Sequence, residues 1–104
     1  MRLERDHGCR TGLTWRCDVR ADPPMDRLID AFEAHGFTLQ GESFGVVNLD
    51  ADGDRRHRVI LVPKTGRLQL RLDYTTPHEE RDAEAARVGT LLARILEEGD
   101  ALPP

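Results

Sequence analysis

The alternation of apolar and polar residues is clearest in the stretch 67–74. Four apolar residues share one side of an extended chain there and are expected in the core: Leu68, Leu70, Leu72 and Tyr74. The preceding stretch 59–62 is apolar on both sides, as in a strand inside a sheet. Residues 63–66 connect the two stretches and include a glycine, so we predict a β-hairpin.

Two further stretches are predicted to be strands. The stretch 13–20 alternates as strictly as 67–74, and its predicted core residues are Leu13, Trp15, Cys17 and Val19. The stretch 37–49 is predicted to be one strand. Gly41 and Gly45 interrupt it, and its apolar parity changes along its length, which indicates a β-bulge.

Two stretches have the apolar spacing of helices. The first follows Asp22, which is expected to cap it, and Gly36 is expected to end it. The second runs over 77–98, and Thr76 with Glu79 forms a capping-box pattern at its start.

The resulting order is β-α-β-β-β-α, and it predicts the α+β fold class. We expect a two-layer sandwich, in which a largely antiparallel four-stranded sheet has two helices packed on one face. The chain has 104 residues, enough for one domain. The expected parts are a flexible N-terminal arm at 1–11, a single α+β domain at 12–99 and a C-terminal tail at 100–104.

Two helices on one face leave the opposite face of the sheet open. If the alternating strands turn their apolar sides toward the helices, four arginines point away from them: Arg16, Arg20, Arg67 and Arg71. Apolar residues of the other strands are expected beside these arginines: Phe44, Val46, Ile60 and Val62. Arginines around an apolar strip are typical of protein interfaces, so these eight residues form the predicted binding site. The alternative is a solvated face with weak cross-strand ion pairs.

Charge composition bears on the choice of partner. The net charge is −4, whereas nucleic-acid-binding and membrane-binding domains are usually basic. Fourteen of the fifteen basic residues are arginine, a bias that favours planar contacts with carboxylates or phosphates but that a GC-rich bacterial genome also produces.

Binding of nucleic acid through the four arginines is the first alternative function. The helix–strand–strand–strand–helix order from Met25 onward resembles double-stranded-RNA-binding domains in the order of its elements alone. A basic cluster is expected at the start of the last helix in that family, and this chain has Glu79 and Glu80 there.

A metal or thiol site at His7, Cys9 and Cys17 is the second alternative function. Structural zinc takes four ligands, usually with a close pair of cysteines, and Cys9 and Cys17 are eight positions apart. Cys17 also lies on the predicted core side of its strand, where a cysteine acts as a small apolar residue. We therefore expect no cofactor and no metal.

Short sequence motifs add no enzyme chemistry to this picture. Residues 41–45 match the G-x-S-x-G pattern, but no helix is predicted after them, as a nucleophile elbow requires. The N-terminus has no apolar signal-peptide core, and no stretch approaches the ~20 apolar residues of a membrane span, so a cytoplasmic location is expected. The sequence predicts a small non-enzymatic domain, an adaptor or regulator, that binds a protein partner or itself through the open sheet face.

Overall fold

The computed structural model describes residues 2–7 and 12–103 as one antiparallel sheet with helices. The strands lie in the order β1-β2-β6-β5-β4-β3, and every neighbouring pair is antiparallel. The described elements are β1 (Glu4–Arg5), β2 (Thr14–Asp18), α1 (Met25–Ala34), β3 (Phe37–Ser43), β4 (Val46–Ala51), β5 (Arg58–Val62), β6 (Arg67–Arg71), the 3₁₀ helix η1 (His78–Glu80) and α2 (Arg81–Glu98).

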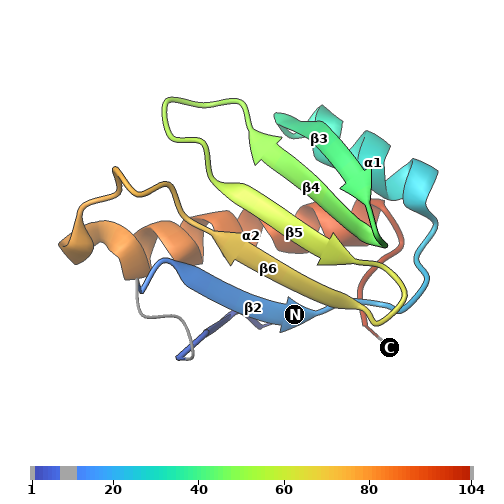
Figure 1. The fold of residues 1–104 in the computed structure, drawn as a ribbon, viewed down its shortest axis with the longest axis horizontal. Helices are drawn as coiled ribbons and strands as arrows, with labels where there is room; N and C mark the ends of the chain where they lie inside the picture. The colour runs from blue at the N-terminus through green and yellow to red at the C-terminus, as the bar shows by residue number, and fades with distance from the viewer. Residues whose placement is uncertain (1, 8–11, 104) are drawn as a thin grey trace.

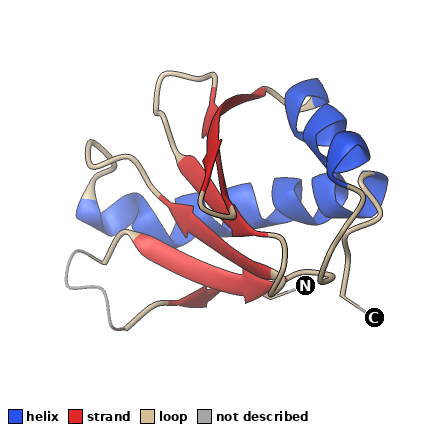
Figure 2. Ribbon diagram, turned by 45° about the vertical axis from the view of Figure 1, so that its right-hand side comes forward, coloured by secondary structure: helices blue, strands red, loops and turns tan. Residues whose placement is uncertain are grey.

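Figures 1 and 2 show α2 crossing behind the sheet, with α1 on the same side near β3. The α+β class predicted from the sequence is confirmed. The core lies between the helices and the sheet, because the alternating strands bury the residues that face α1 and α2. Phe32 of α1 and Phe37 of β3 meet edge to face there, with ring centroids 5.4 Å apart.

The predicted count of four strands is wrong, because the described sheet has six, and the stretch 37–49 accounts for one of the two additional strands. It forms the hairpin β3–β4 rather than one strand. Phe44 and Gly45 make its two-residue turn with φ values of 53° and 74°, the left-handed backbone that a type I′ turn requires at both positions. The bulge expected in this stretch is present between Leu39 and Gly41. The added strand gives a helix–four strands–helix order, so the resemblance to double-stranded-RNA-binding domains is wrong.

The strand β1 lies in the segment that the sequence assigns to the N-terminal arm. Its Arg5 covers the indole of Trp15 at 5.3 Å from the ring centroid and bonds Asp82 of α2 at 3.1 Å. Gly89 of α2 makes room for Leu3, because a Cβ at position 89 would lie 2.9 Å from the Leu3 Cδ1 atom. These contacts attach residues 3–5 to both the sheet and α2. Residues 8–11 of the predicted arm lie outside the described residues.

The prediction that Tyr74 belongs to the core is wrong, since its side chain is 83% exposed. The strand β6 ends at Arg71, and the chain turns at Asp73 instead of continuing the alternation. The Asp73 carboxylate accepts the backbone N–H groups of Thr75 and Arg56, at 3.0 and 2.9 Å. A side chain that bonds the backbone two residues ahead favours a turn over a strand.

Neither helix starts with the predicted cap. The first turn of α1 has no side-chain cap, and Asp22 adopts a left-handed φ of 48° three residues before the helix. At the other helix, Thr76 is buried and its hydroxyl has no hydrogen-bond partner, while η1 forms the transition into α2. Packing of the apolar faces therefore stabilises both helices without the predicted caps. The predicted end of α1 is confirmed, because Gly36 follows it with φ of 84°.

Candidate interface on the outer sheet face

The face of the sheet directed away from α1 and α2, the outer face, is read from the alternation of burial along the strands. In β5, Val59 and Leu61 are fully buried, and Ile60 and Val62 are only half-buried. The outer pair is therefore the one predicted from the sequence. The strand register then groups the outer residues into three rows that cross the sheet.

An apolar strip lies on this face, defined by Phe44, Val46, Ile60 and Val62. Val47 pairs with Leu61, so Val46 lies beside Val62 in the same row. Phe44 lies in the turn between β3 and β4, two residues before Val46, and its side chain is fully exposed. Val46 and Val62 therefore lie at one end of this face, next to the turn that contains Phe44, and Ile60 lies in the central row beside them.

Three of the four predicted arginines border this strip. Arg16 of β2 and both Arg67 and Arg71 of β6 are exposed and lie on the outer face by their register. Arg20 lies beyond the end of β2, where its guanidinium bonds the Asp100 carboxylate at 2.8 Å and its backbone N–H bonds Ala101. It therefore connects β2 to the segment after α2.

An ion pair that the sequence analysis did not find crosses the same face. Arg58 of β5 donates to both carboxylate oxygens of Asp50 on β4, at 2.7 and 3.0 Å. These hydrogen bonds raise the pKa of the Arg58 guanidinium above its usual value. The register makes Arg58 and Asp50 direct neighbours, but their pairing could be found only after β4 was recognised as a separate strand.

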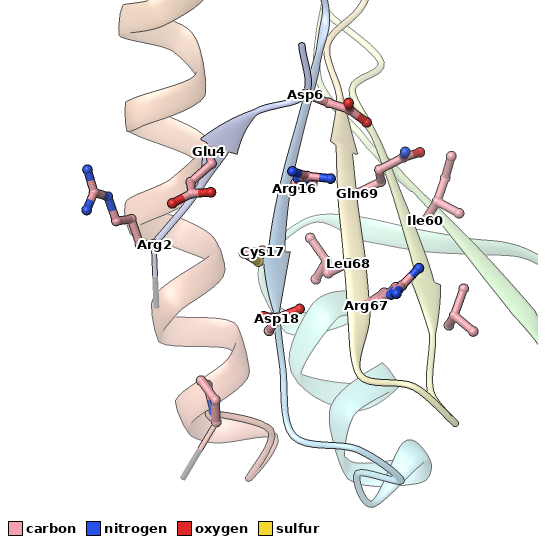
Figure 3. Close-up of a pocket in the computed structure, with 12 residues that line it drawn as sticks. Arg2, Glu4, Asp6, Arg16, Cys17, Asp18, Ile60, Arg67, Leu68 and Gln69 are labelled. Atoms are coloured by element: carbon pink, nitrogen blue, oxygen red, sulfur yellow. The ribbon is translucent and has the colours of Figure 1, made fainter. Parts of the chain in front are cut away.

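A groove with a volume of about 840 Å³ borders this face at β1, β2, β6 and β5. Figure 3 shows Arg16, Gln69 and Ile60 on three successive strands of the groove, with Arg67 and Asp18 nearer to one end. Its lining mixes arginines and carboxylates with aliphatic side chains.

A second cluster, centred on His57, is buried on the other side of the β4–β5 connection. The His57 side chain is 3% exposed, and its Nδ1 accepts the backbone N–H of Asp73 at 2.9 Å. The Nε2 atom therefore carries the ring hydrogen and donates it to Glu84, at 3.2 Å. Arg87 also donates to Glu84 through Nε at 3.0 Å. Both ring nitrogens are hydrogen-bonded, so His57 connects the segment after β6 to α2.

The carboxylates around His57 favour their charged forms. Hydrogen bonds from Arg87, and then from His57, lower the pKa of Glu84, against an opposing effect of burial. The backbone N–H groups of Thr75 and Arg56 lower the pKa of Asp73. Sequence reasoning missed this cluster because His57 and Glu84 are 27 positions apart and no spacing links them.

The predicted metal or thiol site is only partly within the described residues. His7 is exposed, and Cys9 lies outside the described residues. Cys17 is buried on the core face of β2. Burial, with a smaller effect of Asp18, raises the pKa of the Cys17 thiol to about 11, which disfavours the thiolate that acts as nucleophile or metal ligand. No cluster of three or more potential metal ligands occurs within residues 2–7 and 12–103.

The sequence motif at residues 41–45 has the geometry of a hairpin. Ser43 ends β3 and is exposed, and the chain reverses at the next two residues. A nucleophile elbow needs a strand followed by a helix, so this serine is not held as a nucleophile. Among the described residues, neither helix has the length and apolar character that crossing a membrane requires.

Comparison with known proteins gives no family assignment: no protein-family model, no curated protein and no solved structure matches this chain.

Proposed function

We propose that this chain is a non-enzymatic protein-binding domain that associates with a second copy of itself through the outer face of its sheet. The observation that carries the proposal is the apolar strip on the outer face, on the side of the sheet away from the helices. Exposed Arg16, Arg67 and Arg71 border this strip. An apolar centre with a polar and arginine-rich rim is the usual composition of a protein interface.

Phe44 adds the anchor residue that such interfaces use. Its ring is fully exposed at the hairpin tip, next to Val46. Large aromatic side chains and arginines contribute most to the binding energy of protein interfaces. Burying one such ring stabilises the complex by about 25 cal/mol for each Å² of apolar surface that is removed from water. A second copy carries the same strip, so one surface serves both partners of a two-fold dimer.

The proposal is tested by the oligomeric mass of the purified protein in native mass spectrometry and analytical ultracentrifugation. We expect the wild-type chain to have the mass of two chains. The variants Ile60→Asp and Val62→Asp are expected to be monomers, because each places a charge in the centre of the buried strip. Tyr74→Asp is the matched control, since it removes an exposed apolar ring outside the outer face and should leave the dimer intact.

A second pair of variants separates loss of association from loss of folding. Ile60→Thr and Val62→Thr keep the β-branched shape that a strand prefers and remove only apolar surface. We expect them to keep the circular dichroism spectrum of the wild type and to weaken dimerisation by about tenfold, or about 1.4 kcal/mol. A wild-type chain that stays monomeric over the whole concentration series would overturn the proposal.

A further inference from the structure

We infer that the two copies pack face to face about a two-fold axis that runs along β5. This inference rests on the proposed function and adds the geometry of the interface. The sheet order places β6 and β2 on one side of β5, and β4 and β3 on the other. A rotation about an axis along β5 therefore sets β6 opposite β4 of the second copy, and β2 opposite β3. Two sheets commonly pack in this way with their strands aligned to within about 30°.

The central row of the outer face is complementary to itself under this rotation. The row contains Glu4, Arg16, Gln69, Ile60, Asn48 and Gly41, in that order across the sheet. Glu4 of β1 lies three strands from β5, and no strand of the second copy lies opposite it under this rotation. Ile60 meets Ile60 of the second copy on the axis. Gln69 comes opposite Asn48, and two amides can exchange hydrogen bonds. Arg16 comes opposite Gly41, which has no side chain to obstruct it and open space around its Cα atom.

The row at one end of the sheet matches charges. It contains Arg71 on β6, Arg58 on β5 and Asp50 on β4. The rotation places Arg71 opposite Asp50 of the second copy, so opposite charges meet. Arg58 lies on the axis and therefore meets Arg58 of the second copy. The charge of each guanidinium is balanced by the Asp50 carboxylate of its own chain, through two hydrogen bonds.

The row at the other end carries the apolar contacts. Val62 meets Val62 of the second copy near the axis, and Val46 comes opposite Arg67. Phe44 extends just beyond Val46, so its ring also approaches Arg67 of the second copy. An arginine over an aromatic face is a favourable cation–π contact, and the aliphatic stem of Arg67 can cover Val46. Asp18 in this row comes opposite Ser43, which can donate a hydrogen bond to it.

The other simple two-fold arrangement is disfavoured by the same rows. An axis that crosses the strands at Ile60 would set β6 opposite β6 and exchange the two end rows. Arg67 of one copy would then face Arg71 of the other. Like charges that face each other in a desolvated interface repel strongly. The distribution of charge on the outer face therefore selects the axis along β5.

The axis is tested with single cysteines in a Cys9→Ser, Cys17→Ala background, using a bis-maleimide that spans about 10 Å, the spacing of two packed sheets. The variants Arg16→Cys and Gly41→Cys are co-expressed with different tags. We expect a cross-linked mixed dimer, because the two positions face each other. Either variant alone should give little product, because in the inferred dimer position 16 lies about 19 Å sideways, or four strand spacings, from its own symmetry mate.

The variant Ile60→Cys separates the inference from the proposed function. Position 60 meets its own mate under either axis, so cross-linking of Ile60→Cys alone reports only that the outer faces meet. Suppose that Ile60→Cys cross-links, and that Arg16→Cys alone gives at least as much cross-linked product as the mixed pair. The axis along β5 is then wrong, and the outer-face dimer stands. If a dimer forms and neither Ile60→Cys nor the mixed pair cross-links, both the inference and the outer-face interface are wrong. Tyr74→Cys mixed with Arg16→Cys is the control pair.

Discussion

At the scale of single residues, Phe44 has a backbone conformation that is unfavourable for the folded monomer and a side chain that would favour the proposed dimer. A left-handed φ costs an ordinary residue about 1–2 kcal/mol relative to its preferred conformation, and Phe44 adopts 53° with its ring in solvent. Strained backbone conformations of this kind cluster at functional segments. In the inferred dimer the Phe44 ring becomes buried, and this burial offsets the strain.

We therefore expect Phe44→Asn to stabilise the monomer and weaken the dimer. The substitution creates the Asn-Gly turn that type I′ hairpins prefer, and it should raise the free energy of unfolding by about 1 kcal/mol. Urea unfolding in the Ile60→Asp background measures this effect without a contribution from association. In the wild-type background, the same substitution should raise the dimer dissociation constant. A destabilised monomer would show that the ring makes intramolecular contacts that matter.

At the scale of elements, the β5–β6 hairpin depends on a close backbone approach at Gly66. Its φ is 72°, and a Cβ atom built on it would lie 2.4 Å from the carbonyl oxygen of Val19. A hydrogen bond holds the two segments this close, because the Val19 backbone N–H donates to the Gly66 carbonyl at 2.7 Å. The turn is therefore attached to the end of β2 at a distance that only glycine permits.

The matched pair Gly66→Ala and Gly36→Ala separates this contact from the cost of a positive φ. Gly36 has a similar φ of 84°, but a Cβ atom there meets nothing within 4 Å. We expect Gly36→Ala to cost about 1 kcal/mol in thermal or urea unfolding, from backbone strain alone. Gly66→Ala should cost at least about 1 kcal/mol more, because the backbone at Val19 must move. Equal costs would mean that the β2 end yields freely.

The elements that could be predicted from the sequence are those with an unbroken period. Alternation placed β2 and β6 correctly. It could not decide which side of β5 faces outward, because residues 59–62 are apolar on both sides, and the burial of Val59 and Leu61 shows that Ile60 and Val62 are the outer pair. The prediction of one strand over 37–49 was wrong because phenylalanine is not a typical turn residue, so the sequence did not indicate a chain reversal at Phe44.

Short elements and contacts between distant positions also could not be predicted from the sequence. A two-residue strand such as β1 has no period to detect, and it is held by Arg5 contacts to Trp15 and Asp82 that join distant positions. Of the candidate site, the apolar strip and three of the four arginines lie together on the structure. Arg20 lies elsewhere because β2 ends at Asp18, and the Arg20 guanidinium bonds the Asp100 carboxylate beyond the end of the strand.

At the scale of the whole molecule, the buried cluster around His57 joins the β4–β5 connection, the segment after β6 and α2. Its carboxylates Glu84 and Asp73 accept hydrogen bonds from side chains and backbone in the folded state. The pKa of each carboxyl is lowered by folding. Each contributes stability that is fully present above its unfolded pKa and is lost as the pH falls through the folded value.

We therefore expect the free energy of unfolding to fall as the pH drops below about 4.3, the usual pKa of a glutamate. Urea unfolding at a series of pH values in the Ile60→Asp background measures the slope. Glu84→Gln should lower the free energy of unfolding at pH 7 by about 1 kcal/mol, because the ion pair with Arg87 is lost. It should also reduce the dependence of the free energy of unfolding on pH in the acid range. Glu97→Gln, at an exposed position of α2, is the control and should change neither quantity. If the slope of Glu84→Gln equals that of the wild type, the His57 cluster is not the acid-sensitive part of this fold, and the loss of stability must come from the carboxylates of the surface.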